Sequence, residues 1–199
     1  MNVIISKNEL DVIIEDLKQG NVVAIPTDTV YGVAAIINDQ ALVKLFELKQ
    51  RENKPIAVLA YNLEQIKSVV NDISFEVATL VDQFLPGPLT LVLEKKEGLS
   101  DILTQGLSTV GVRIPNDSVT LQVLKEVGPL AVTSANLSGE VPINTPSELE
   151  LKFPEIKILE GEVKFFEAST VLLVAEQLKI LRKGPISLDQ IKKALDYKD

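Results

Sequence analysis

The sequence predicts an α/β domain with a twisted, mixed parallel and antiparallel sheet and flanking helices. Short apolar runs rich in β-branched residues are separated by longer segments with helical spacing, but the two do not alternate strictly as in a doubly wound fold. The chain has 199 residues, of which 46% are hydrophobic, and can therefore bury a sizeable core. We expect residues 1–199 to form a single domain.

The first elements are predicted from apolar runs and helix caps. Residues 1–5 form an opening strand, and residues 7–19 form an amphipathic helix that Ser6 caps and Gly20 closes. Residues 22–25 form a buried strand. Further along, the expected elements are a helix over 39–49, a strand over 55–59, helices over 63–70 and 75–84, and a strand after the turn made by Pro86, Gly87 and Pro88.

The stretch "STVGVRIPN" alternates with the period of a strand. Val110, Val112 and Ile114 point to the core face, while Thr109 and Arg113 point to the other face, which is small, polar and cationic. The remaining expected elements are a helix over 118–127, a strand over 130–133, late strands over 157–159, 169–174 and 179–182, and a closing helix over 188–195. Residues 142–150 are expected to be a mobile loop.

The composition excludes several classes of site. The chain has no cysteine and no histidine, which excludes disulfides, a thiol nucleophile, the usual zinc sites and Ser-His triads. A net charge of −8 argues against nucleic acid as the main partner. With no long apolar run and no secretion signal, we expect a cytoplasmic protein that does not enter a membrane, and no metal site built by the protein.

Polar residues gather at the ends of five apolar segments, where α/β sheets place their ligands. These segments are "PTDTVYG" (26–32), "KQRENKP" (49–55), "STVGVR" (108–113), "TSANLSG" (133–139) and "ILRKGPIS" (180–187). They contain all three arginines of the chain, whereas its 17 lysines are spread more widely. Taken singly, each segment also fits a helix cap, a turn, a charge at a helix end or a surface ion pair. Their joint occurrence favours one ligand site, although no Walker or GxGxxG phosphate motif is present.

In this order, "PTDTVYG", "LKQR…KP", "PGPLTLVL", "STVGVRIP", "SANLSG", "STV" and "ILRKG" resemble the YrdC/Sua5 family of threonylcarbamoyl-AMP synthases. The resemblance covers about residues 20–184 and implies a single YrdC-like domain with a concave ligand pocket. Because the chain ends soon after the last motif, the short single-domain form of the family is expected.

The resemblance implies an ATP-dependent nucleotidyltransferase. It would convert L-threonine, bicarbonate or CO₂, and ATP, with Mg²⁺, into threonylcarbamoyl-AMP and pyrophosphate for the t6A37 modification of ANN-decoding tRNAs. A downstream threonylcarbamoyl transferase complex is the implied partner. Positioning and charge stabilisation can drive such a reaction without a covalent nucleophile.

The resemblance also implies residue roles. The implied catalytic pair is Lys49 and Arg51. The implied threonine-binding residues are Thr29, Tyr31, Arg113, Val132 (through its backbone) and Ser169. The implied ATP-binding residues are Arg51, Lys54, Thr109, Ser134, Asn136, Asn144 and Arg182.

Two other functions stay open. This fold is associated with binding of double-stranded RNA or tRNA, and a paralogue of the same fold could act on another carbamoyl acceptor. For the synthase, we expect Arg51→Ala to weaken ATP use and Arg113→Ala to weaken threonine use. Both changes should cost little stability, because both arginines should project away from the core.

Overall fold

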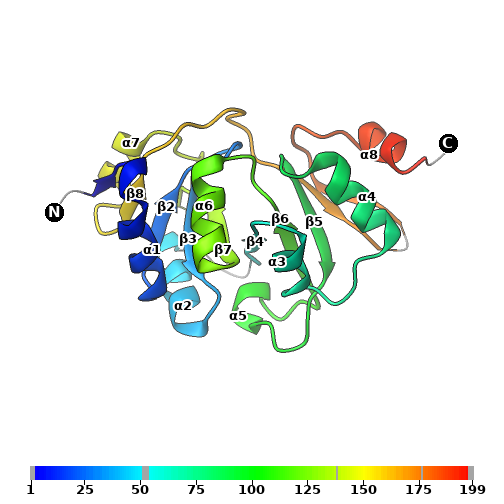
Figure 1. The fold of residues 1–199 in the computed structure, drawn as a ribbon, viewed down its shortest axis with the longest axis horizontal. Helices are drawn as coiled ribbons and strands as arrows, with labels where there is room; N and C mark the ends of the chain where they lie inside the picture. The colour runs from blue at the N-terminus through cyan, green and yellow to red at the C-terminus, as the bar shows by residue number, and fades with distance from the viewer. Residues whose placement is uncertain (1–2, 51–53, 138, 176, 197–199) are drawn as a thin grey trace.

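The computed structural model describes residues 3–50, 54–137, 139–175 and 177–196. Its strands form one ten-stranded sheet in the order β1-β8-β2-β3-β7-β4-β6-β5-β9-β10, which crosses the molecule from end to end (Figure 1). The first and the last described residues lie at opposite ends of the molecule (Figure 1). The strands are β1 (Ile4–Ile5), β2 (Val23–Ile25), β3 (Gly32–Ile36), β4 (Ala57–Leu59), β5 (Leu89–Glu94), β6 (Thr109–Arg113), β7 (Leu130–Ser134), β8 (Lys157–Leu159), β9 (Thr170–Leu173) and β10 (Lys179–Arg182).

The sheet is mixed, as the sequence predicts. β1 with β8, β8 with β2, β4 with β6 and β5 with β9 pair in parallel, whereas the other neighbours are antiparallel. A 3-10 turn (Lys7–Glu9) precedes the first helix. The helices are α1 (Leu10–Lys18), α2 (Asp39–Lys49), α3 (Leu63–Lys67), α4 (Phe75–Phe84), α5 (Asp101–Thr104), α6 (Ser118–Val127), α7 (Pro146–Lys152) and α8 (Leu188–Ala194).

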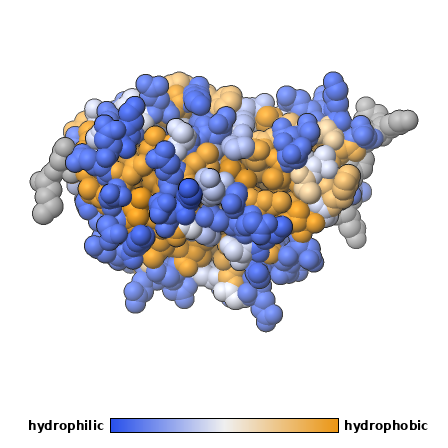
Figure 2. Space-filling view, in the orientation of Figure 1, coloured by the Kyte–Doolittle hydropathy of each residue, from blue (hydrophilic) through white to orange (hydrophobic). Residues whose placement is uncertain are grey.

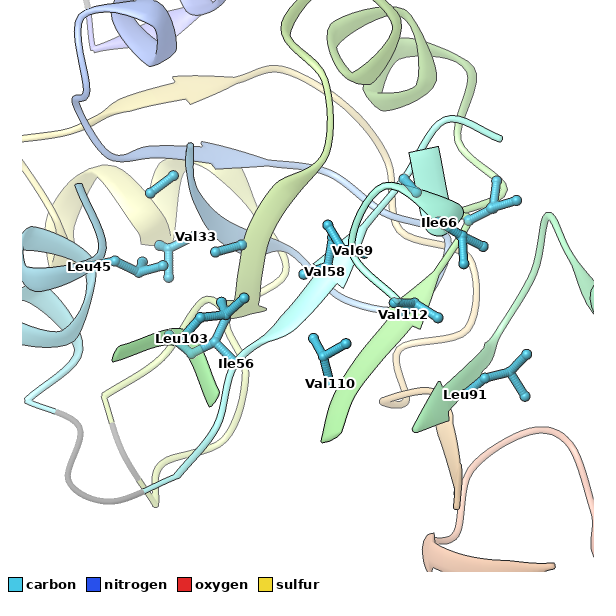
Figure 3. Packing of buried hydrophobic residues seen from close by; sticks show 14 of the residues in the cluster. Val33, Leu45, Ile56, Val58, Ile66, Val69, Leu91, Leu103, Val110 and Val112 are labelled. Carbon is cyan, nitrogen blue, oxygen red and sulfur yellow. The ribbon is translucent and has the colours of Figure 1, made fainter. Parts of the chain in front are cut away.

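Buried side chains pack on both faces of the sheet. On one face, Ile13 and Leu17 of α1 and Leu124 of α6 belong to a cluster that covers β2 and β7. On the other face, the cluster includes Leu45 of α2 and Val58 of β4. Figure 3 shows this second cluster, in which the labelled side chains of β3, β4, β5 and β6 lie with those of α2, α3 and α5. Helices on both faces of the sheet therefore contribute to the core.

The strand β6 shows why the alternation in "STVGVRIPN" matters. Val110 and Val112 are buried in the core cluster, so this part of the prediction is confirmed. Gly111 and Arg113 lie on the opposite face, beside Ala57 and Leu59 of the paired strand β4. This second face of β4 and β6 forms one side of a cavity.

Three regions differ from the expectations, and one of them is the short helix α5 (Asp101–Thr104), which is not among the expected helices. β3 (Gly32–Ile36) is not among the expected strands, because it is buried on both faces and shows no alternation of apolar and polar residues. The expected loop over 142–150 is wrong in its second half, where α7 begins at Pro146. Thr145 caps this helix, proline suits its first position, and Leu149 is buried on the core.

The described helices are too short or too polar to span a membrane. Within residues 3–50, 54–137, 139–175 and 177–196, no helix combines the length and the apolar character needed to cross a bilayer. Figure 2 shows hydrophilic residues along the outer sides of the helices and hydrophobic residues mainly in the gaps between them.

Candidate functional site

A cavity of about 240 Å³ opens where the polar segments of the sequence meet. It lies between the turn after β2, the face of β4 and β6 that is turned away from the core, the end of β7, and the start of β9 with the end of β10. Its lining residues are Thr27, Thr29, Val30, Tyr31, Gly32, Pro55, Ile56, Ala57, Leu59, Thr90, Gly111, Arg113, Val132, Thr133, Ser134, Ala168, Ser169, Val171 and Arg182. Seven of the predicted site residues are thus brought together: Thr29, Tyr31, Arg113, Val132, Ser134, Ser169 and Arg182.

Two glycines keep the cavity open and the strands close. A Cβ atom at Gly32 would lie 2.5 Å from Cγ1 of Val132 on the paired strand β7, so the Val132 side chain would have to move. A Cβ atom at Gly111 would lie 3.2 Å from Cγ2 of Thr90, and Gly111 itself lines the cavity. The absence of a side chain at these two positions therefore lets their neighbours approach closely.

Arg113 lines the cavity next to Thr29 and is held by three hydrogen-bond partners. Its Nε donates to the carbonyl oxygen of Gly87 at 2.8 Å, its Nη1 donates to Oγ1 of Thr29 at 2.7 Å, and its Nη2 donates to Oδ1 of Asp28. The residue is only 5% exposed. Burial lowers the pKa of Arg113, and the neighbouring Asp28 carboxylate opposes this shift. The guanidinium still keeps its charge, because an arginine starts from a very high value.

This burial corrects one expectation. Arg113 does project from the non-core face of β6, but it is enclosed by Asp28, Thr29 and Gly87 and is not exposed. Removing its side chain would leave the fully buried Asp28 carboxylate without its countercharge. The expectation that Arg113→Ala costs little stability is therefore wrong.

The threonines of "PTDT" have different tasks. Thr27 closes the turn itself, because its Oγ1 donates to the carbonyl oxygen of Val30 at 2.6 Å and accepts the amide hydrogens of Thr29 and Val30. Thr29 accepts from Arg113 and lies 2.9 Å from Oγ1 of Thr27. The turn interpretation thus describes Thr27, while Thr29 belongs to the cavity wall.

Tyr31 is one of the residues that line the cavity, but its hydroxyl bonds elsewhere. Its Oη donates to the carbonyl oxygens of Leu159 and Gly161, at 3.0 and 3.1 Å. The side chain is fully buried, and burial raises the pKa of Tyr31 far above its usual value, so the hydroxyl stays protonated. Its backbone amide donates to Oδ1 of Asn144 at 3.3 Å, which places that predicted residue behind the wall.

The opposite wall is built from hydroxyls and Arg182. Oγ of Ser169 lies 2.8 Å from Oγ1 of Thr90, and Arg182 donates to the carbonyl oxygen and Oγ of Ser169 at 3.0 and 3.1 Å. Arg182 is exposed overall, although desolvation of its guanidinium still lowers its pKa. Gly184 allows this arrangement, because a Cβ atom there would lie 2.4 Å from the backbone nitrogen of Thr170.

Lys49 lies behind the end of β7 and not in the cavity lining. It is 1% exposed, and its Nζ donates to the carbonyl oxygens of Ser134 and Asn136 and, at 2.8 Å, to Oδ1 of Asn136. Ser134 also donates to Oδ1 of Asn136 at 2.7 Å. A buried ammonium group thus holds the "SAN" segment in place, and this segment carries two of the predicted ATP-binding residues.

Three further predicted residues lie away from the cavity lining or outside the described residues. Thr109 is half-buried at the start of β6, and Lys54 is exposed just before Pro55. Arg51 lies outside the described residues. The prediction for Arg51 therefore stands on the resemblance alone.

Sequence reasoning missed Asp28, Thr90 and Gly111. Thr90 follows "PGPL" as a single polar residue in an apolar strand. Asp28 stands between Thr27 and Thr29, and only the hydroxyl of Thr29 was assigned to the site. The signal for Asp28 was present: an acidic residue inside an apolar segment needs a cationic partner when it is buried.

Comparisons with known proteins agree with the geometry. A family model described as Sua5/YciO/YrdC, telomere recombination, matches residues 15–184. The chain belongs to this family. Within the Sua5/YciO/YrdC family, it is 32% identical over 193 residues to a putative threonylcarbamoyl-AMP synthase of Methanocaldococcus jannaschii, covering 93% of this chain and 90% of that protein. It is 36% identical over 185 residues to the threonylcarbamoyl-AMP synthase of Bacillus subtilis, but covers only 53% of it.

A solved structure of the Sua5/YciO/YrdC family shows the same fold. Pyrococcus abyssi Sua5 complexed with L-threonine superposes with a TM-score of 0.92 at 30% identity, covering 98% of this chain and 61% of that one. The predicted mixed α/β fold is therefore confirmed.

Among the described residues, no group of three or more acidic side chains could hold a metal ion.

Proposed function

We propose that this protein is an L-threonylcarbamoyladenylate synthase, a nucleotidyltransferase that uses L-threonine, bicarbonate or CO₂, and ATP. The observation that carries the proposal is the wall formed by Arg113 and Thr29, which presents a cationic fork to a cavity of about 240 Å³. Such a fork suits the carboxylate of a small amino acid. The names of the relatives and the threonine complex of the P. abyssi protein support the same substrate.

The two walls then divide the substrates. Threonine lies against Arg113, Thr29 and the backbone of Val132, with Ser169 beside it. The nucleotide lies toward Ser134, Asn136 and Arg182, and Arg182 supplies positive charge to the triphosphate. Its further predicted contacts are Lys54, Thr109, Asn144 and Arg51.

The chemistry needs positioning more than a nucleophile on the protein. The threonine amine adds to CO₂ to give a carbamate and releases a proton. A carbamate oxygen then forms a bond to the α-phosphorus of ATP while the bond to pyrophosphate breaks. Fixed cations and hydroxyls stabilise the charge that moves onto the leaving group. Lys49 and Arg51 remain the proposed catalytic pair. Lys49 would contribute by holding the backbone of Ser134 and Asn136 in place through the hydrogen bonds of its ammonium group.

We propose that Mg²⁺ enters with the phosphates of ATP. Magnesium usually keeps several waters and is held by substrate phosphates with few protein ligands. The ion would neutralise charge on the phosphates during transfer.

The product would serve t6A37 formation in tRNA in the cytoplasm, through a threonylcarbamoyl transferase complex.

The test is pyrophosphate release by the purified protein with ATP and Mg²⁺, omitting threonine and bicarbonate in turn. Release that requires both supports the synthase. Release with another amine in place of threonine would instead identify a paralogue with a different carbamoyl acceptor. No release, together with strongly salt-dependent binding of double-stranded RNA or tRNA, would favour the RNA-binding alternative.

A further inference from the structure

The carboxylate of Asp28 has an unusual environment. Its side chain is fully buried, and Oδ1 accepts from Nη2 of Arg113 and from the backbone amide of Asn116 at 3.0 Å. The other oxygen, Oδ2, has no hydrogen-bond partner among the described residues. A buried carboxylate oxygen without a partner is costly, and such atoms are uncommon in folded proteins.

Asp28 does not reach the ligand itself. The cavity is lined by its neighbours Thr27 and Thr29, but not by Asp28. Any effect of its carboxylate on a ligand in the cavity therefore passes through the groups that it contacts, and the charged one is Arg113.

The donors of Arg113 explain why one oxygen is used. A guanidinium has five N–H donors, and Arg113 spends one each on Gly87, Thr29 and Asp28, which leaves two. A two-oxygen pairing with Asp28 would use one more donor. The single-oxygen contact keeps that donor for a ligand, at the cost of leaving Oδ2 unpaired.

Asp28 also joins the segments around this wall. Its carbonyl oxygen accepts the amide hydrogens of Lys164 and Phe165, at 3.2 and 2.9 Å, and Oδ1 accepts that of Asn116. The turn after β2, the connection from β8 to β9 and the turn after β6 therefore meet at one residue. The carboxylate that orients the Arg113 guanidinium thus belongs to a residue whose side chain is held by the amide of Asn116 and whose backbone is held by Lys164 and Phe165.

We infer that Asp28 is a positioning residue: its one-oxygen contact fixes the Arg113 guanidinium so that two N–H donors remain for the carboxylate of the amino-acid substrate. The inference rests on the proposed function for the identity of that substrate. It assigns to Asp28 a role in threonine binding and not in the chemistry of the nucleotide.

The first readout is the side-chain NMR spectrum of the arginines in ¹⁵N-labelled protein. The chain has only three arginines, and Arg113→Lys identifies the signal of Arg113. We expect a rigid guanidinium with separate Nη signals in the native protein. Asp28→Asn, which keeps the shape but removes the charge, should broaden or merge these signals. Unchanged Arg113 signals in Asp28→Asn would overturn the inference.

The second readout is L-threonine binding by isothermal titration calorimetry, with the KM for ATP measured alongside. Asp28→Asn should weaken threonine binding about 10- to 100-fold and leave the KM for ATP within about twofold, since a charged hydrogen bond is worth about 1.5–3 kcal/mol. Asp28→Glu, which keeps the charge, should recover part of the loss. Equal weakening for both substrates would indicate a merely structural role and would contradict the inference.

The matched control is Asp117→Asn. Asp117 lies in the same region and caps α6 through the amide of Thr120 at 2.8 Å, but it does not contact Arg113. This variant should leave the Arg113 signals and threonine binding unchanged, and the same loss in Asp117→Asn as in Asp28→Asn would overturn the inference. If the native protein binds no threonine, the proposed function fails, and the Arg113 spectra alone then decide whether Asp28 fixes the guanidinium.

Discussion

Arg113 and Arg182 stand on opposite walls of the same cavity and are held in opposite ways. Arg113 is 5% exposed and paired with the buried carboxylate of Asp28. Arg182 is exposed, bonds only to Ser169, and has no carboxylate within ion-pair distance among the described residues. The first arginine is electrically balanced and fixed, whereas the second adds net positive charge at the mouth of the cavity.

The difference teaches how one cavity can serve two kinds of anion. A buried, preset fork suits a small ligand with one carboxylate, because little entropy is lost on binding. An exposed cation suits a larger and more highly charged group, which it can follow and attract from solution. The proposed division of threonine and ATP between the two walls therefore agrees with their electrostatics.

The largest expected effect comes from Arg113→Met. It leaves Asp28 buried and uncompensated, which should lower the free energy of unfolding by about 3–5 kcal/mol and abolish threonine use. Urea denaturation and threonine-dependent pyrophosphate release measure the two losses. The double variant Asp28→Asn/Arg113→Met should recover most of the stability but none of the activity. A stable but inactive single variant would show that the pair is not a buried ion pair in solution.

Arg182→Ala should show the opposite pattern. Its side chain is exposed, so the free energy of unfolding should fall by about 1 kcal/mol, from the hydrogen bonds to Ser169. The KM for ATP should rise about tenfold or more, while the KM for threonine changes little. Steady-state kinetics with each substrate varied in turn tests this, and equal increases in both constants would remove the distinction between the walls.

A smaller effect is expected from Thr90→Val, which removes a hydroxyl and keeps the shape. Thr90 is buried and shares a hydrogen bond of 2.8 Å with Ser169, which the proposal places beside threonine, so the loss should be about 1 kcal/mol in stability with a several-fold rise in the KM for threonine. Thr79→Val is the control, because Thr79 bonds the carbonyl oxygen of Phe75 on the exposed side of α4. A kinetic effect of the same size in the control would show that Ser169 is not held through Thr90.

The smallest effect is on pH dependence, through Asp117 near the Arg113 wall. Burial raises the pKa of Asp117 above its ordinary value of 3.8. The native state therefore binds the proton of the Asp117 carboxyl more tightly than the unfolded state does. The free energy of unfolding contributed by Asp117 falls as pH rises from the unfolded-state pKa through the higher native-state pKa. Relative to Asp117→Asn, the native protein should lose stability from about pH 4 upward and then level off. Urea titrations at several pH values measure the difference, and a constant difference would contradict the raised pKa.

The sequence determined the mixed α/β class, most helices and strands, and the segments that supply the cavity, because those depend on local periodicity and caps. The clearest case is the strand β6, where alternation along the chain assigns each residue to a face of the sheet. Val110 and Val112 lie on the core face, and Gly111 and Arg113 lie on the cavity face. The strand β3, buried on both faces, carried no such signal.

Only the tertiary structure decided what the charged residues contact. Arg113 is 84 and 85 residues away from Thr29 and Asp28 in the chain, and their ion pair exists because β6 and the turn after β2 converge. Lys49 likewise turns away from the cavity lining to the carbonyl oxygens of a segment 85 residues later. Local patterns give the face on which a side chain lies, but its partner and its burial depend on which distant segments fold against it.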